Sequence, residues 1–130
     1  MKLSLIILGS PYGSQSPTSA LAFARAAIDS GHQIYRVFFY HDGVYTASKL
    51  SISPQDEKFP GEEWANFAQQ QQLDLVVCIS AASRRGIMDQ QEAERHELTH
   101  ASLKSAYEIS GLGQYIDAAI QSDRLITFGN

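Results

Sequence analysis

Five short apolar runs alternate with helical segments along this chain, and the alternation limits the folds that it can adopt. The runs lie at residues 5–8, 33–40, 73–80, 107–109 and 124–128. Parallel strands buried on both faces appear as nearly continuous apolar runs, and each needs a crossover, usually a helix, to reach the next strand. We therefore predict an α/β fold: a three-layer αβα domain with a mainly parallel five-stranded sheet and a flavodoxin-like architecture.

Length and composition agree with a single domain over residues 1–130. A chain of this size lies in the usual range for one domain, and 44% hydrophobic with 18% charged residues is typical of a globular protein. The sequence has no internal repeat and no linker-like stretch that would divide it.

Capping residues and glycines mark the expected helix ends. Ser16 and Pro17 are expected as the N-cap and first-turn proline of the first helix, and Gly31 as the residue that ends it. Asp89 and Glu92 have the spacing of a capping box for a polar helix. The last helix is expected to bury one apolar face, formed by Leu112, Tyr115, Ile116, Ala119 and Ile120.

The stretch from His41 to Pro60 is the longest part of the chain without a helix or strand pattern. Loops of this length in compact domains are commonly functional. Its scattered apolar residues would be hard for a lone monomer to cover, so we predict that the loop forms a protein interface. The alternative is that the loop folds back on its own domain. These apolar residues are Val44, Tyr45, Leu50, Ile52 and Phe59.

The only cysteine, Cys78, lies at the end of the most apolar run and precedes a small-residue turn with Arg84 and Arg85. Ligands and reactive groups in open α/β sheets collect just outside the carboxyl ends of the strands. A thiol near cations or a helix N-terminus ionises more readily than an isolated one. Cys78 is therefore a candidate catalytic thiolate, with Arg84 and Arg85 as candidates for stabilising its anion. The alternative is a small core residue of a purely structural protein, because free cysteines are among the most buried residue types.

The segment His96–His100 reads H-E-L-T-H and matches the H-E-x-x-H zinc motif. On a helix this spacing places two imidazoles one turn apart. A catalytic zinc also needs a third protein ligand, and no extended motif follows. The polar surroundings favour a solvated helix end, so we predict no metal.

The turn Gly9–Gly13 is a weak candidate for holding a phosphate at a helix N-terminus. It lacks the spacing of dinucleotide-binding and P-loop motifs, so a tight turn between strand and helix is favoured. We predict no cofactor, and a flavodoxin-like nucleotide- or flavin-binding module is kept as an alternative function. Other aromatic and histidine residues near strand ends are interpreted as packing or isolated side chains: Tyr12, Tyr40, Tyr45, His32 and His41.

Charge, cysteine content and hydropathy bear on location and partners. One cysteine cannot form a disulfide within the chain, which fits a reducing compartment. The net charge of −4 argues against broad binding of nucleic acids or anionic membranes. The stretch Leu5–Leu8 is shorter than a signal-peptide core of roughly 7–15 residues, and no run approaches the roughly 20 apolar residues of a membrane span. We therefore expect a cytoplasmic protein.

Several separated motifs resemble, in order, the DsrE family of sulfurtransferases, and most nearly its TusD-type members. The resemblance extends over essentially the whole chain, and the family's active cysteine falls at the strand end that Cys78 occupies here. The H-E-L-T-H segment is not part of the family pattern. The motifs are Gly9–Gly13, Val37–Tyr45, Cys78–Gly86, Ser110–Gly113 and Ser122–Arg124.

This resemblance implies a sulfur relay. Cys78 would accept a sulfane sulfur as a persulfide and pass it to a cysteine of another protein, for 2-thiolation of the tRNA wobble uridine. Sulfur oxidation, which related DsrE proteins serve, is the alternative destination. The resemblance also implies a heterohexamer with TusB-like and TusC-like subunits, a donor of TusA type and an acceptor of TusE type, without direct binding of tRNA.

Overall fold

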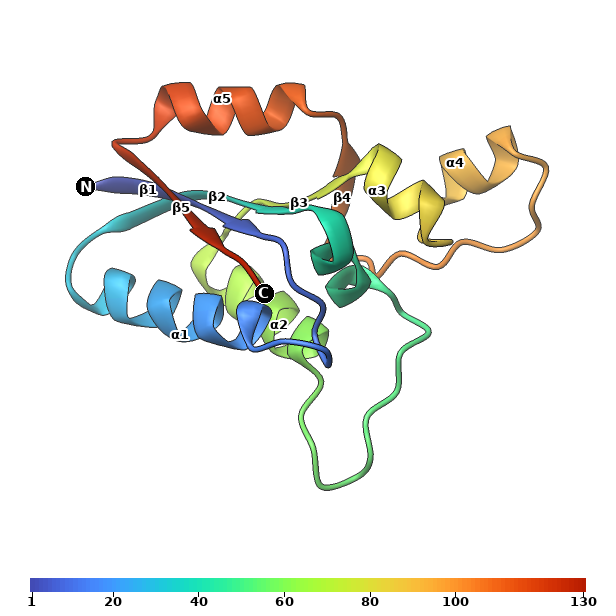
Figure 1. Ribbon diagram of the computed structural model, residues 1–130, viewed down its shortest axis with the longest axis horizontal. Helices are drawn as coiled ribbons and strands as arrows, with labels where there is room; N and C mark the ends of the chain where they lie inside the picture. Colours follow the sequence, from blue (N-terminus) through green and yellow to red (C-terminus); the bar gives the residue numbers. More distant parts are fainter.

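All five strands of the protein pair in parallel in a single sheet (Figure 1). The computed structural model describes all 130 residues, Met1–Asn130. The strand order is β4-β3-β2-β1-β5, and every pairing is parallel, so the predicted α/β fold with a five-stranded parallel sheet is confirmed. The elements are β1 (Lys2–Ile7), α1 (Ser16–Asp29), β2 (Gln33–Phe39), the 3-10 helix η1 (His41–Ala47), α2 (Pro60–Gln71), β3 (Leu75–Cys78), α3 (Ile79–Arg84), α4 (Gln90–Arg95), β4 (Glu108–Ser110), α5 (Gly113–Gln121) and β5 (Arg124–Phe128).

The helices form unequal layers on the two faces of the sheet. Helices α1 and α2 cover one face and α5 covers the other, while α3 and α4 lie beyond the carboxyl end of β3 (Figure 1). The chain moves across the sheet from β1 to β4 and then returns to the far side of β1 for β5. Parallel crossovers are right-handed, so this reversal of direction places α5 on the face opposite α1 and α2. None of the helices is both long and apolar enough to cross a lipid bilayer.

Successive side chains of β2 point to opposite layers, as the two-residue period of a strand requires. The ring of Phe39 packs edge-on against Trp64 of α2, with the ring centroids 6.0 Å apart. The ring of Phe38 packs edge-on against Tyr115 of α5, at 5.6 Å. Both phenylalanines are completely buried, so β2 joins the two halves of the core.

The beginning of α1 differs from the prediction. Gln15, not Ser16, is the N-cap residue, and no side chain caps the helix. The Ser16 hydroxyl instead donates a hydrogen bond to the Phe128 carbonyl oxygen at 2.7 Å and accepts one from the Gly9 amide at 3.2 Å. Ser16 therefore joins the carboxyl ends of β1 and β5. At the other end of the helix Gly31 has φ +90°, and its predicted role in ending α1 is confirmed.

The stretch from residue 41 to residue 60 was wrongly expected to lack a helix. Its first part is η1, which lies over the carboxyl ends of the strands. A Cβ atom on Gly43 would lie 2.1 Å from the Ile7 carbonyl oxygen, so this close approach requires glycine. Val44 and Phe59 are buried, whereas Leu50 and Ile52 are strongly exposed. The loop thus folds partly back on its own domain.

Helix α5 presents a different face to the sheet from the predicted one. Ala118 is the only fully buried residue of α5, while Leu112, Ile116 and Ile120 are 49%, 56% and 73% exposed. The predicted burial of these three residues is therefore wrong, and Ala119, predicted on the same face, is exposed as well. The side of α5 that faces the sheet instead carries Tyr115 and Ala118, and the hydrogen bond from Arg36 of β2 to Asp117 holds the helix in this orientation.

The capping box of the polar helix is confirmed in part. The Asp89 carboxylate, at the N-cap of α4, accepts a hydrogen bond from the Glu92 amide at 2.8 Å. This helix ends after six residues at Arg95, so the H-E-L-T-H segment, which we expected at the end of the helix, lies beyond it.

Candidate functional site

Cys78 occupies the junction between a strand and a helix at the carboxyl edge of the sheet. It is the last residue of β3 and the N-cap residue of α3. On one side, Cys78 pairs in register with Ser110 of β4. On the other side, Phe39 pairs with Val77, so the next residue, Tyr40, lies opposite Cys78.

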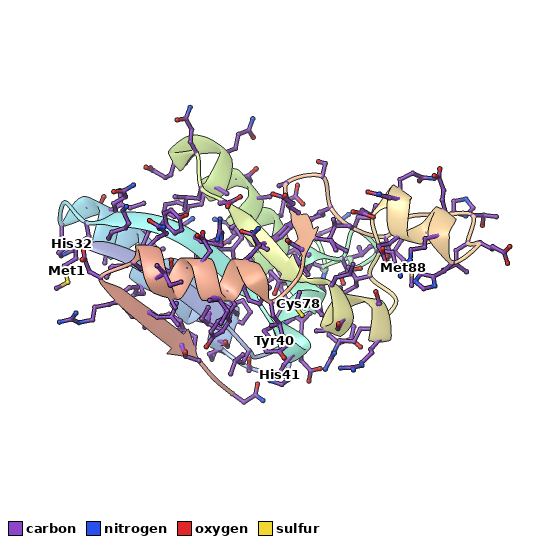
Figure 2. All side chains as sticks on the ribbon, turned by 90° about the horizontal axis from the view of Figure 1, so that it is seen from above. Met1, His32, Tyr40, His41, Cys78 and Met88 are labelled. Atoms are coloured by element: carbon purple, nitrogen blue, oxygen red, sulfur yellow. The ribbon has the colours of Figure 1, made fainter.

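The alternation of side chains assigns Cys78 to the face that α5 covers. Val77 shares the register of Phe39, whose ring contacts α2, and Cys78 is the next residue along the strand. In Figure 2, seen from the α5 side, the labels of Cys78 and Tyr40 lie close together near one end of this helix. The thiol is only 2% exposed, and its sulfur forms no hydrogen bond.

Helix α3 begins directly after Cys78, in place of the small-residue turn that we predicted. The first amide groups of a helix have no partners within the helix, and the amino end of the helix dipole favours negative charge. Cys78 stands at this end of α3 as its N-cap residue, and its side chain caps none of these amides.

The predicted arginines lie at the opposite end of this helix. At about 1.5 Å per residue, Arg84 is roughly 9 Å along α3 from Cys78. The Arg85 guanidinium forms an ion pair with Asp42 at 2.9 Å and donates to the Ala81 carbonyl oxygen, also at 2.9 Å. Arg84 is exposed and forms no ion pair. Neither arginine hydrogen-bonds to Cys78, and Arg85 instead ties α3 to η1.

An apolar cavity of about 370 Å³ opens over the carboxyl ends of β1 and β2, and Cys78 is not among the residues that line it. Sites in open α/β sheets commonly lie just outside the carboxyl ends of the strands, where this cavity opens. The lining includes residues from β1, β5 and α5. The residues are Ile6, Leu8, Tyr40, His41, Leu112, Tyr115, Ile116 and Thr127.

Tyr40 and His41 are the residues of this edge to which the sequence interpretation gave no functional role. Their rings stack with centroids 4.4 Å apart, and His41 has the left-handed φ of +48°. A residue other than glycine rarely adopts this conformation, and such strain is concentrated at functional sites. The position of Tyr40 after an apolar strand was the available signal, but packing aromatic residues occupy such positions too.

The H-E-L-T-H segment does not lie on one helical face. His96 is the C-cap residue of α4, and Glu97 has φ +59°, which turns the chain out of the helix. The His96 imidazole lies 3.5 Å from a Glu92 carboxylate oxygen. No three histidine, cysteine, aspartate or glutamate side chains gather anywhere as a metal site.

The Gly9–Gly13 turn uses its polar groups within itself. The Gly9 amide donates to the Ser16 hydroxyl, and the Gly13 amide donates to the Ser10 hydroxyl at 3.0 Å. The Ser16 amide donates to the Ser14 hydroxyl at 3.2 Å. Because these donors are occupied, the geometry favours a structural turn over a phosphate-binding one.

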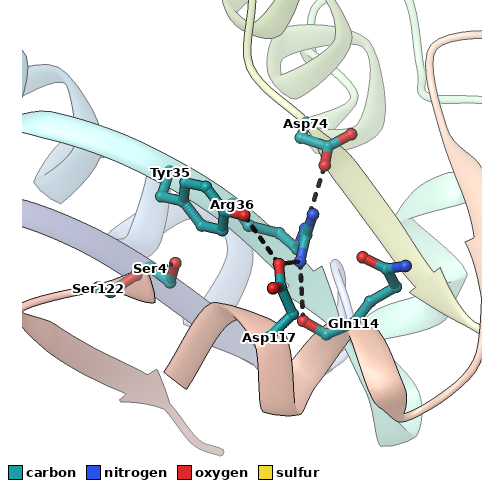
Figure 3. Close-up of polar contacts among 7 residues, drawn as sticks. All are labelled: Ser4, Tyr35, Arg36, Asp74, Gln114, Asp117 and Ser122. Atoms are coloured by element: carbon teal, nitrogen blue, oxygen red, sulfur yellow. Dashed lines mark hydrogen bonds and ion pairs between the residues drawn. The ribbon is translucent and has the colours of Figure 1, made fainter. Parts of the chain in front are cut away.

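A polar cluster around Arg36 joins the sheet to α5, farther from the carboxyl edge than Cys78 (Figure 3). Arg36 pairs with Asp74 at 3.0 Å and with Asp117 at 2.8 Å, and it donates to the Gln114 carbonyl oxygen at 2.9 Å. Burial lowers the pKa of Arg36, but hydrogen bonds to the two carboxylates outweigh it and raise the pKa overall. A hydrogen bond from Tyr35 and then one from Arg36 lower the pKa of Asp117. The cluster holds α5 in place above the site.

Comparison with known proteins gives one consistent family. The profile of the DsrE/DsrF-like family matches residues 1–128. A protein of Allochromatium vinosum, provisionally named sulfurtransferase DsrE, is 48% identical over 130 residues, with all of both chains covered. A sulfurtransferase TusD homolog of Pseudomonas aeruginosa is 43% identical, covering 99% of this chain and 98% of its own. Sulfurtransferase TusD of Serratia proteamaculans is 41% identical, covering 95% and 96%.

A solved structure supports the fold independently of the sequence. The crystal structure of the ychN protein from E. coli superposes with a TM-score of 0.73, at 21% identity, over 98% of this chain and 99% of that one. Family match, full-length relatives and shared fold together show that this chain belongs to the DsrE/DsrF-like family and is a sulfurtransferase.

Proposed function

We propose that this sulfurtransferase carries sulfur on Cys78 as a persulfide and passes it to the cysteine of another protein. The observation that carries the proposal is the position of Cys78, the only cysteine, between a buried strand and the start of a helix at the carboxyl edge of the sheet. A thiolate is the nucleophile in sulfur exchange, and Cys78 is the only residue of this sequence that supplies a thiol.

Two exchange steps account for the transfer. The Cys78 thiolate attacks the outer sulfur of a donor persulfide, so that a new sulfur–sulfur bond forms on Cys78 as the donor's bond breaks and its thiolate leaves. The acceptor's thiolate then attacks the outer sulfur on Cys78, takes it, and releases the Cys78 thiolate. Each step exchanges one sulfur–sulfur bond for another, so the two need no external oxidant or reductant.

The single cysteine favours a relay over a self-contained reaction. An internal second thiol would release the sulfur and close a disulfide, but this chain has none. The acceptor therefore has to be another molecule. We propose that the protein works in the cytoplasm on protein partners, a role that suits its net charge of −4, and leaves tRNA to a downstream enzyme.

We propose 2-thiolation of the tRNA wobble uridine as the destination of the sulfur. The support is similarity over nearly the full chain to relatives named TusD. The proposal includes TusB-like and TusC-like partner subunits, a TusA-type donor and a TusE-type acceptor. Sulfur oxidation is the second candidate, favoured by 48% identity to the Allochromatium vinosum protein.

Intact-mass measurement tests the persulfide directly. The protein is incubated with glutathione persulfide, freed of excess reagent and weighed by mass spectrometry. We expect a gain of one sulfur atom in the wild type, reversal by dithiothreitol, and no gain in Cys78→Ala. A wild-type protein that stays unmodified, or a Cys78→Ala variant that gains the same mass, would refute the role of Cys78.

A bacterial strain lacking its own TusD tests the destination. Expression of the wild-type chain, together with its partner subunits, is expected to restore 2-thiouridine in tRNA, and Cys78→Ala is the matched control. Sulfur loading without restored thiolation would leave the carrier role in place and favour sulfur oxidation.

A further inference from the structure

A relay thiol has to meet its reaction partners, yet the thiol of Cys78 is closed off. It is 2% exposed, and the neighbouring 370 Å³ cavity does not reach it. Attack on a donor persulfide requires direct contact between two sulfur atoms. Some neighbouring group must therefore move before Cys78 can react.

Tyr40 is the neighbour whose placement suits this movement. Neighbouring strands lie about 4.8 Å apart, so residues that share a register and a face have adjacent side chains. Tyr40 lies opposite Cys78 by the register of β2 and β3, and their labels lie close together in Figure 2. Tyr40 also lines the cavity, whereas Cys78 does not. In the strand order β3-β2-β1, Tyr40 therefore comes between Cys78 and the cavity over β1 and β2.

The Tyr40 side chain is held only by ring contacts. Its hydroxyl forms no hydrogen bond, while its ring stacks on His41 and meets Phe38 edge-on at 6.1 Å. The cavity beside it supplies room for the ring to enter. A rotation of the side chain therefore breaks no hydrogen bond.

The backbone around Tyr40 is fixed on both sides, so the movement does not require the loop to open. The Tyr40 amide donates to the Ile7 carbonyl oxygen at 2.9 Å. Two residues later, Asp42 is paired with Arg85 of α3. The left-handed His41 between these anchors sets the direction in which the chain leaves the strand.

We propose that Tyr40 is a positioning residue that gates Cys78: its ring shields the thiol at rest and rotates into the adjacent cavity to admit a sulfur donor or acceptor. The inference rests on the proposed function only in taking Cys78 as the relay thiol. Shielding at rest would protect a persulfide from water and from unrelated thiols, since reactivity of such groups depends on access.

Alkylation of the folded protein by iodoacetamide tests the gate, because Cys78 is the only thiol and every adduct reports on it. In Tyr40→Ala we expect the alkylation rate to rise by about tenfold or more, since the open state no longer depends on a local rearrangement. Tyr40→Phe keeps the ring and is expected to react at the wild-type rate. Tyr40→Leu serves as a second ring-removing variant if Tyr40→Ala does not fold.

Two controls separate the gate from general loosening. Leu112→Ala removes another side chain from the same cavity and is expected to leave the rate unchanged. The faster rate of the ring-removing variants should depend only weakly on low urea concentrations, because a local opening exposes little surface. An unchanged rate in both ring-removing variants, an equal rise in Leu112→Ala, or a steep urea dependence would overturn the gate.

Failure of the gate and failure of the carrier role give different results. A protein that loads sulfur on Cys78 but alkylates equally fast with and without the Tyr40 ring lacks the gate alone. A protein that shows the alkylation differences but never gains sulfur has a shielded thiol with no relay function.

Discussion

At the residue scale, Cys78 combines a reactive group with an apolar, enclosed position. Its sulfur has no polar partner, and its neighbours along β3 are buried aliphatic residues. The polar groups next to it in the chain are the backbone amides at the start of α3, the helix that begins directly after Cys78. Replacements of Cys78 therefore affect packing as well as chemistry.

Cys78→Ser is expected to destabilise the fold despite its small change in size. A buried hydroxyl without a hydrogen-bond partner costs about 1–3 kcal/mol in protein interiors. We expect the urea unfolding free energy of Cys78→Ser to fall by about this amount and to lie below that of Cys78→Ala, which introduces no polar atom. Equal stability of the two variants would mean that the serine hydroxyl finds a partner. Cys78→Ala is for this reason the better control for sulfur loading.

At the element scale, the orientation of α5 depends on polar contacts from β2. Arg36 reaches both Asp117 and the Gln114 carbonyl oxygen, and Tyr35 donates to Asp117 at 2.8 Å (Figure 3). Hydropathy alone predicted that Leu112, Ile116 and Ile120 would face the sheet. One buried arginine reverses that result, because leaving its charge unpaired would cost more than exposing aliphatic side chains.

The Asp117 contacts give a pH dependence whose sign follows from the lowered pKa. The pKa of Asp117 in the folded protein lies below its ordinary value of 3.8, so its carboxylate stabilises the fold above that pH. The contribution is lost as pH falls through the folded-state pKa. We expect Asp117→Asn to be less stable than the wild type near neutral pH, and the difference to narrow below about pH 4.

Urea unfolding at a series of pH values measures this difference. Asp56→Asn, in the exposed loop before α2, is a matched control and is expected to show no difference at any pH. If the difference in unfolding free energy between the wild type and Asp117→Asn stays the same at every pH down to the lowest one measured, the charge of the carboxylate does not hold α5.

At the scale of the whole molecule, the proposed assembly has a surface available in the loop before α2. Leu50 and Ile52 are strongly exposed there, whereas Val44 and Phe59, expected at the same interface, are buried. Exposed apolar side chains grouped in one loop are typical of binding surfaces. Tyr45 is 39% exposed as well, so the loop interface stays a prediction for three of the five residues, namely Tyr45, Leu50 and Ile52.

Co-expression with TusB-like and TusC-like subunits tests this assembly. Size exclusion with mass measurement is expected to give a complex that contains all three chains. The double variant Leu50→Asp and Ile52→Asp should fold as the wild type does but be lost from the complex. A wild-type chain recovered only as a monomer would remove the assembly and leave the chemistry of Cys78 untouched.

Much of this fold is predictable from local patterns, and its departures have definite causes. The five strands follow from apolar runs, and β5 matches its predicted range, Arg124–Phe128, although it is an edge strand without a fully buried residue. Ser16 departs from the pattern because a distant carbonyl, that of Phe128, competes for its hydroxyl. The early end of α4 and the left-handed Glu97 likewise have no local signature.

The sequence predicts where the candidate site lies in the fold, but not which residues surround Cys78. Cys78 at a strand end follows from the sequence, whereas its neighbour Tyr40 depends on which strands pair and in which register. Arg84 and Arg85 are close to Cys78 along the chain, but the turn between them is a helix, which carries them away from it. Sequence proximity indicates contact only when the conformation of the intervening residues is known.

The strand order has a consequence for the time course of folding during synthesis. β1 is the first strand to leave the ribosome, and one of its two neighbours, β5, is the last of the five. Until Arg124–Phe128 emerges, β1 presents an unpaired and strongly apolar edge, the kind of surface at which nascent chains aggregate. The sheet is thus complete only after β5 is made, and a chain cut short before Arg124 would keep this edge of β1 open.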